Sequence, residues 1–157
     1  LVEKLVELDG RFTAPDNKRE MQDVSFNDDL INIKFGFDKK GQPNMVAFNR
    51  LSTRYLKGEI DSYYIISIDG KTNNVTLFDL YQQLPYTNYN VGTGQVMLKE
   101  KQFFSQFDQK KDYSLSKYTI INTMRQMKLQ SHKDHIKLKE EQLKKSLELF
   151  DKTLSLY

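Results

Sequence analysis

The stretch Asp23-Val-Ser-Phe-Asn-Asp-Asp-Leu-Ile-Asn-Ile-Lys34-Phe-Gly36 contains two short runs rich in apolar residues, separated by three residues of the kind that form tight turns. Residues 24–26 and 30–35 therefore predict two strands joined by a turn at residues 27–29. Lys34 stands inside the second run, although lysine is rarely buried unless a nearby group needs its charge. Either this strand lies at the edge of a sheet and Lys34 points into water, or Lys34 is part of a functional site.

The chain has 157 residues and no cysteine. This length predicts one domain with a core of its own, without disulfides or thiolate metal sites, and a reducing cytoplasm is its natural setting. No apolar run approaches the length of a membrane span, and residues 1–8 are too charged for a signal peptide. The chain does not begin with Met, and the sequence leaves open whether an N-terminal region is missing.

The charge is unevenly distributed, although the net charge is only +3. Residues 95–145 hold twelve Lys and Arg against six Asp and Glu, whereas residues 1–94 hold eleven against thirteen. A basic half beside an acidic patch suits a polyanionic partner that meets a metal site. A solvated helix surface would give the same counts.

The order of the expected elements predicts an α/β domain, with a small mixed β-sheet flanked by helices and a helical C-terminal region. These elements are a helix over 1–8, the hairpin, a helix over 44–56, a central apolar strand over 62–68, its partner over 75–78, a glycine-rich loop at 92–94, and two helices after 112. We expect one domain overall, in which residues 1–112 form the core and residues 113–157 pack on the core or on DNA.

Three polar residues of the hairpin are suited to phosphodiester hydrolysis. Asp23 and Asn32 are close enough in sequence for a short hairpin to bring them into register, and Lys34 projects from the same face of its strand as Asn32. Carboxylates hold Mg²⁺ next to a phosphate, while a lysine orients or deprotonates water and offsets negative charge. Alone, this pattern is weak.

Five blocks of sequence, the first two of them in the hairpin, stand in one collinear order between roughly residues 20 and 130. They are Asp23-Val-Ser-Phe26, Ile31-Asn-Ile-Lys34, Gln42-Pro-Asn-Met-Val-Ala-Phe-Asn-Arg50, Tyr63-Tyr-Ile-Ile-Ser-Ile68 and Gly92-Thr-Gly-Gln-Val-Met-Leu-Lys99. With these blocks the chain resembles the type II restriction endonucleases of the PD-(D/E)XK superfamily, especially the branch that cuts six-base palindromes to leave blunt ends. The resemblance implies a restriction-endonuclease-like core.

The resemblance also implies roles for the hairpin residues. Asp23 would bind Mg²⁺, Lys34 would be the catalytic lysine, and Asn32 would stand in place of the second metal-binding acid. Because an amide is a poorer Mg²⁺ ligand than a carboxylate, the chain is either an inactivated variant or recruits another acid. The candidates for that acid are Asp28, Asp29 or an acid elsewhere in the chain. Glu7 on the first helix resembles an upstream acid that some members contribute, or is a solvated helix charge. As the metal-binding aspartate, Asp16 of the literal Pro-Asp pair ranks below Asp23.

By the same resemblance, two loops would contact double-stranded DNA. Amide side chains in the loop at residues 42–44 and in the glycine-rich loop at residues 92–94 suit the donor and acceptor pattern of base edges. The glycines allow close approach of the backbone. The residues concerned are Gln42, Asn44, Asn90, Gly92, Thr93, Gly94 and Gln95, with Lys99, Lys101, Arg50, Arg54 and Lys117 as candidates for phosphate contacts. The alternatives are a simple tight turn and ordinary surface solvation.

The expected function is therefore that of a Mg²⁺-dependent, site-specific DNA endonuclease of a bacterial restriction-modification system. Palindromic targets imply a homodimer. The expected location is the bacterial cytoplasm. No nucleotide cofactor is expected, since Gly92 and Gly94 lead into a strand-like run, and His132 and His135 are interpreted as surface residues. Two alternatives remain: a protein of the same fold that binds DNA without cutting, and a helical interaction protein. The latter would use the heptad-like residues Ile136, Leu143, Leu147, Phe150, Leu154 and Tyr157.

Overall fold

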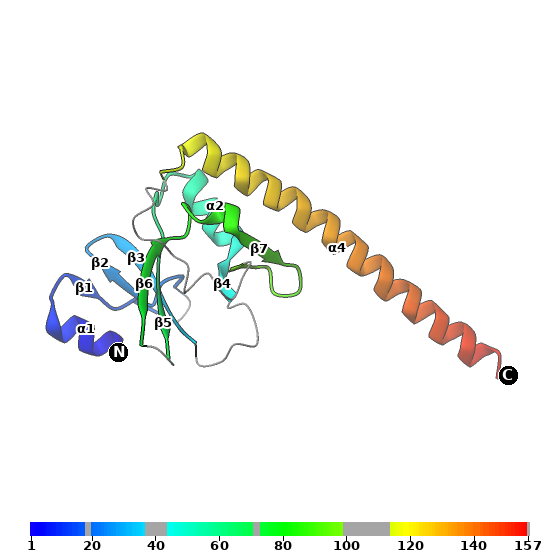
Figure 1. Ribbon diagram of the computed structural model, residues 1–157. Coiled ribbons are helices and arrows are strands. Elements are labelled where there is room, and N and C mark those ends of the chain that lie inside the picture. The colour runs from blue at the N-terminus through cyan, green and yellow to red at the C-terminus, as the bar shows by residue number, and fades with distance from the viewer. Residues whose placement is uncertain (18–19, 37–43, 71–72, 99–113, 157) are drawn as a thin grey trace.

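The computed structural model describes residues 1–17, 20–36, 44–70, 73–98 and 114–156. A five-stranded mixed sheet has the strand order β1-β2-β3-β5-β6, and a three-stranded sheet has the order β4-β8-β7 (Figure 1). The elements are α1 (Val2–Leu8), β1 (Phe12–Thr13), β2 (Val24–Phe26), β3 (Asp29–Gly36), β4 (Asn44–Ala47), α2 (Phe48–Leu56), β5 (Tyr64–Asp69), β6 (Val75–Asp79), the 3₁₀ helix η1 (Leu84–Tyr86), β7 (Thr87–Asn90), β8 (Gln95–Leu98) and α4 (Lys117–Leu154). The expected mixed α/β architecture is confirmed.

The hairpin predicted from residues 23–36 is present as β2 and β3. The two strands are antiparallel, with Val24 opposite Ile31 and Phe26 opposite Asp29. The turn between them requires a left-handed backbone at Asn27, whose φ of 51° is a conformation that asparagine tolerates better than most residues. The N–H of Asn27 also donates to the carbonyl of Arg11, which ties the turn to the chain before β1.

The strand β5 lies inside the larger sheet, between β3 and β6, as its apolar sequence predicted. It runs parallel to β3, with Lys34 opposite Ser67, and antiparallel to β6, with Ile65 opposite Phe78. A parallel pair needs a crossover connection, and α2 lies in this connection between β3 and β5. The face of the sheet that carries Ile65 is therefore covered by other elements.

The helix expected over residues 44–56 is shorter than predicted, because its first four residues form β4. This strand pairs with β8, with Asn44 opposite Met97 and Ala47 opposite Gln95. The N–H of Phe48 then donates to the carbonyl of Gly94 at the point where α2 begins. Pairing with a distant strand outweighs the local helical spacing, which holds only from Phe48 onward.

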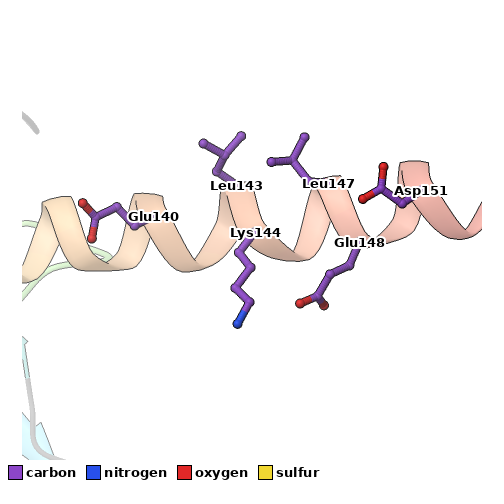
Figure 2. Close-up of a pocket in the computed structure, with 6 residues that line it drawn as sticks. All are labelled: Glu140, Leu143, Lys144, Leu147, Glu148 and Asp151. Carbon is purple, nitrogen blue, oxygen red and sulfur yellow. The ribbon is translucent and has the colours of Figure 1, made fainter.

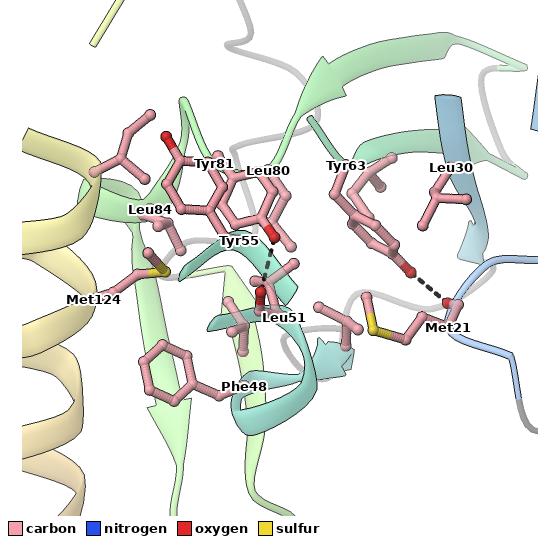
Figure 3. Close-up of a cluster of buried hydrophobic side chains, with 14 of the residues drawn as sticks. Met21, Leu30, Phe48, Leu51, Tyr55, Tyr63, Leu80, Tyr81, Leu84 and Met124 are labelled. Carbon is pink, nitrogen blue, oxygen red and sulfur yellow. Dashed lines mark hydrogen bonds between the residues drawn. The ribbon is translucent and has the colours of Figure 1, made fainter. Parts of the chain in front are cut away.

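The core lies between the larger sheet, α2, η1 and the first turns of α4 (Figure 3). Two fully buried tyrosines are accommodated there because each hydroxyl has a backbone partner. The Tyr81 hydroxyl donates to the carbonyl of Leu51 at 2.8 Å, and the Tyr63 hydroxyl donates to the carbonyl of Met21. The second of these bonds ties β5 to the segment that leads into β2.

The C-terminal region forms one helix, α4, where the sequence predicted two. Ser116 caps it by accepting a hydrogen bond from the N–H of Thr119, and no Gly or Pro follows up to the end of the chain to interrupt it. Ile120 and Met124 are buried against the body, whereas all residues from 139 to 156 are exposed. Within the described parts of the chain, no helix has both the length and the apolar character needed to cross a membrane.

Replacing Asp79 with asparagine should stabilise the protein at neutral pH. The Oδ1 atom of Asp79 accepts hydrogen bonds from the N–H groups of Tyr63 and Tyr81, and burial raises the pKa of the carboxyl group to about 6. The folded state therefore favours the protonated acid, and stability is lost as the pH rises from about 4 to about 6. Asparagine keeps the accepting oxygen without the charge, so we expect a gain of roughly 1–3 kcal/mol at pH 7 and little change at pH 4.

Thermal unfolding at the two pH values measures this effect. The matched control is Asp28→Asn, which alters an exposed acid in the hairpin turn. An equal gain at pH 4 and pH 7 would show that the benefit does not come from the buried charge of Asp79.

Candidate functional site

Asp23 lies at the entrance to β2 and flanks Asn32 of the neighbouring strand. The N–H of Asp23 donates to the carbonyl of Ile31 at 2.9 Å, and its Oδ2 atom accepts the N–H of Ile33 at 2.7 Å. These two bonds go to the residues on either side of Asn32, so the carboxylate is held beside it. The predicted proximity of Asp23 and Asn32 in the hairpin is thus present in the structure.

Asn32 is a buried polar residue whose hydrogen bonding is incomplete. Only 7% of its surface is exposed, and its Nδ2 atom donates to the carbonyl of Met21 at 3.1 Å. Its Oδ1 atom is buried without a hydrogen-bond partner. A buried acceptor left unpaired costs free energy, which makes this oxygen a position where a ligand would be stabilising.

Tyr63 contacts the same backbone carbonyl as Asn32 does, that of Met21. Its hydroxyl also donates to Met21, as the dashed line in Figure 3 shows. Burial raises the pKa of the Tyr63 hydroxyl, with a smaller contribution from Asp23, so the group stays a protonated donor. The Met21 carbonyl therefore receives two donors, which fixes the orientation of the Asn32 amide.

Lys34 is half-buried on the face of β3 that also carries Asn32, because side chains alternate along a strand. The hypothesis of a sheet-edge strand with Lys34 in water is wrong, since β3 lies between β2 and β5. Burial lowers the pKa of the Lys34 ammonium, and the nearby Asp23 carboxylate opposes this shift. A cation, a carboxylate and a buried, unpaired amide oxygen are thus gathered at one place.

Sequence reasoning did not find two further polar residues on this face. Ser67 of β5 lies opposite Lys34, and Thr76 of β6 lies opposite Ser67, so the three form a row across the sheet. Both Ser67 and Thr76 are buried. The sequence signal that could have found this row was Ser67, a polar residue within an apolar run. Because side chains alternate along a strand, Ser67 lies on the same face as Ile65.

The additional acids considered from the sequence lie elsewhere. Asp28 is in the hairpin turn, whereas Asp29 begins β3 and accepts a hydrogen bond from the Ser62 hydroxyl. Asp29 precedes Asn32 by three residues, a separation of about 10 Å along a strand. Glu7 forms an exposed ion pair with Lys4 at 3.1 Å, and Asp16 is exposed in a loop.

The donor set fits a divalent cation held by few protein ligands. Among the described residues, no group of three or more His, Cys, Asp or Glu side chains could hold a metal ion. Asp23 and the unpaired Oδ1 of Asn32 nevertheless supply the oxygen ligands that Mg²⁺ accepts, and Mg²⁺ usually keeps several water ligands. A Mg²⁺ site here would therefore have one carboxylate instead of two.

The glycine-rich loop is the turn between β7 and β8. The Oδ1 atom of Asn90 accepts the N–H groups of Gly92 and Thr93, and the N–H of Gly94 donates to the Asn90 carbonyl at 2.7 Å. Gly94 has a φ of 68°, which glycine adopts at low cost. Asn90 thus shapes the turn, while Thr93 is exposed at its tip and Gln95 begins β8.

The residues that were predicted to contact phosphates differ in exposure and in their neighbours. Arg50 is exposed on α2, Arg54 forms an ion pair with Glu59 at 3.3 Å, and the Lys117 ammonium lies 5.9 Å from the centre of the Tyr55 ring. Asn44 begins β4. Gln42, Lys99 and Lys101 lie outside the described residues. His132 and His135 are exposed on α4, as expected.

No protein-family model and no curated protein matches this chain.

Proposed function

We propose that the protein is a Mg²⁺-dependent DNA endonuclease with a restriction-endonuclease-like core, whose site is built on the hairpin of β2 and β3. The observation that carries the proposal is the unpaired, buried Oδ1 of Asn32, next to Asp23 and on the same face as Lys34. The resemblance of the collinear sequence blocks to the PD-(D/E)XK restriction endonucleases supports the same conclusion. The fold itself agrees with this in its small mixed sheet.

Each residue has a distinct role in the proposed reaction. Asp23 and Asn32 would hold the metal ion, which supplies charge that polarises the phosphate and acidifies a water molecule. Lys34 would offset the negative charge that develops on the phosphate, and its lowered pKa lets it exchange a proton more readily than an exposed lysine does. Tyr63 would keep the Asn32 amide in place through the Met21 carbonyl.

The DNA would lie along the β7–β8 turn and the start of β4. Thr93, Gln95 and Asn44 are the proposed base contacts, and Arg50, Arg54 and Lys117 are proposed to contact phosphates. Two copies acting on a palindromic site, in a bacterial cytoplasm, complete the proposal.

A DNA-binding protein of the same fold that no longer cuts is the second candidate function. It is favoured by the single carboxylate, that of Asp23, beside Asn32, and by the lack of any metal-holding group of acids, histidines or cysteines in the described parts of the chain. The two candidates share the DNA surface and differ only in the metal site, so cleavage assays separate them.

Replacing Lys34 with alanine should lower Mg²⁺-dependent cleavage of mixed-sequence DNA by about 100-fold or more, the usual loss for a group that transfers protons or offsets charge. The fold should tolerate the change, because a half-buried charge is removed. The measurement compares cleavage with and without Mg²⁺, together with the melting temperature.

The matched control is Lys57→Ala, which removes an exposed lysine that lies 3.7 Å from Glu59. Equal cleavage by the two variants would show that Lys34 has no part in the reaction. An absence of Mg²⁺-dependent cleavage in the unchanged protein would instead favour the second candidate.

A further inference from the structure

The outer half of α4 is a long helical segment without a partner among the described residues. The helix contacts η1 and β7 through its first turns, and it then extends away from the body (Figure 1). Every residue from 139 to 156 is exposed. Isolated helices are only marginally stable in water, so a segment of this length normally gains from packing.

An apolar stripe follows this segment at heptad spacing. Successive members are seven, seven, four, three and four residues apart, which is the a and d pattern of a coiled coil. The stripe consists of Leu129, Ile136, Leu143, Leu147, Phe150 and Leu154, which are 46–70% exposed. Figure 2 shows Leu143 and Leu147 on one side of α4, with Lys144 and Glu148 pointing to the other.

The stripe is not the face that α4 uses to pack on its own body. That contact is made by Ile120, Met124 and the buried Ser131, whereas Leu129, two residues before Ser131, is nearly half exposed. The two faces therefore coexist on one helix, and the stripe is available while α4 remains docked.

We infer that the stripe pairs with the same stripe of a second copy of this chain, in antiparallel orientation. In a parallel pair in register, Lys133 and Glu140 at a positions would each face their own counterpart. Like charges at these positions are destabilising. The antiparallel arrangement avoids both repulsions, because a positions then face d positions.

One antiparallel register also brings opposite charges together. When Leu147 faces Leu143 of the partner copy, Leu154 faces Ile136, and Asp151 comes near Lys137 of that copy. The centre of this pairing is residue 145, which lies in the fully exposed segment and keeps the two bodies apart. Charge complementarity and sterics thus favour the same arrangement.

The contact has the size of a small specific interface. Pairing over residues 133–156 gives a contact about 36 Å long at 1.5 Å per residue. The apolar side chains and flanking stems would bury on the order of 1,200 Å² in total, the lower end for specific complexes. This inference depends on α4 alone and not on the proposed nuclease activity.

Light scattering and sedimentation of the full chain test the association. We expect a concentration-dependent dimer, and Leu147→Glu should weaken it by about 100-fold or more, since two charges enter the apolar contact. The control is Leu149→Glu, which changes an equally apolar, exposed residue outside the stripe and should leave the dimer intact. Circular dichroism and the melting temperature report whether each variant remains folded.

Cysteine pairing tests the orientation, because the chain has no native cysteine. Leu143→Cys and Leu147→Cys are oxidised separately and as an equal mixture, and we expect a disulfide chiefly in the mixture. Efficient pairing of either variant with itself would overturn the antiparallel arrangement. A chain that stays monomeric at high concentration, or equal loss of dimer in Leu147→Glu and Leu149→Glu, would overturn the inference itself, whatever the outcome of the cleavage assays.

Discussion

Replacing Asn32 with aspartate should raise Mg²⁺-dependent DNA cleavage by about 100-fold or more. A second carboxylate beside Asp23 binds the cation more strongly than an amide does, and a few kcal/mol of added stabilisation in the transition state corresponds to that factor. The position is suitable because the Oδ1 atom of Asn32 is already buried without a partner. Single-turnover cleavage at several Mg²⁺ concentrations measures the gain.

The same substitution should lower the stability of the metal-free protein. Asn32 loses the Nδ2 donor to the Met21 carbonyl, and two carboxylates then lie close together in a largely buried place. Binding of Mg²⁺ should reverse the loss, by about 2.7 kcal/mol at a concentration one hundred times the dissociation constant. Melting temperatures with EDTA and with Mg²⁺ provide this second measurement.

The matched control is Asn122→Asp, which introduces the same charge at an exposed position of α4 and should change neither cleavage nor the response to Mg²⁺. A variant Asn32→Asp that cleaves no faster, and whose melting temperature ignores Mg²⁺, would show that this hairpin does not hold the metal ion.

Replacing Asp23 with asparagine should abolish cleavage while the protein remains folded. The carboxylate is the only charged oxygen ligand at the proposed site within the described residues, so its loss removes the main attraction for the cation. Asparagine can still accept the N–H of Ile33, which Asp23 accepts at 2.7 Å. DNA binding measured with Ca²⁺ should persist for the parent protein and weaken little for the variant.

Two further variants separate chemistry from folding at this position. Asp23→Ala should also lose cleavage and should additionally lower stability by about 1–3 kcal/mol, because the N–H of Ile33 is left without its acceptor. Asp16→Asn removes the exposed acid of the Pro-Asp pair and should cleave normally. Loss of cleavage in Asp16→Asn, with normal cleavage in Asp23→Asn, would move the metal site to the loop before β2.

Local sequence was sufficient to predict the hairpin and its polar face. Turn residues at 27–29 and apolar flanks predicted β2 and β3, and alternation along a strand placed Asn32 and Lys34 on one side. The continuous apolar run of β5 likewise predicted an interior strand, and β5 lies between β3 and β6. These features depend on neighbours a few residues apart.

The environment of the site depended on tertiary contacts. The Tyr63 hydroxyl and the Asn32 amide meet at the Met21 carbonyl, although Tyr63 is 42 residues away from Met21 in the sequence. The same packing leaves the Asn32 Oδ1 unpaired and lowers the pKa of Lys34. Burial and hydrogen-bond completion are properties of the packed state, and no local pattern contains them.

By itself, the sequence determined the alternation of faces, the turn of the hairpin, the central strand and the heptad stripe of α4, since each follows from residue spacing and local backbone preferences. The tertiary structure decided that residues 44–47 pair with β8 instead of beginning a helix, and that α4 continues without a break beyond the body. The physical reason is that strand pairing and burial draw their free energy from residues far apart in the chain, and this contribution exceeds the small local propensities that favour a helix or its end.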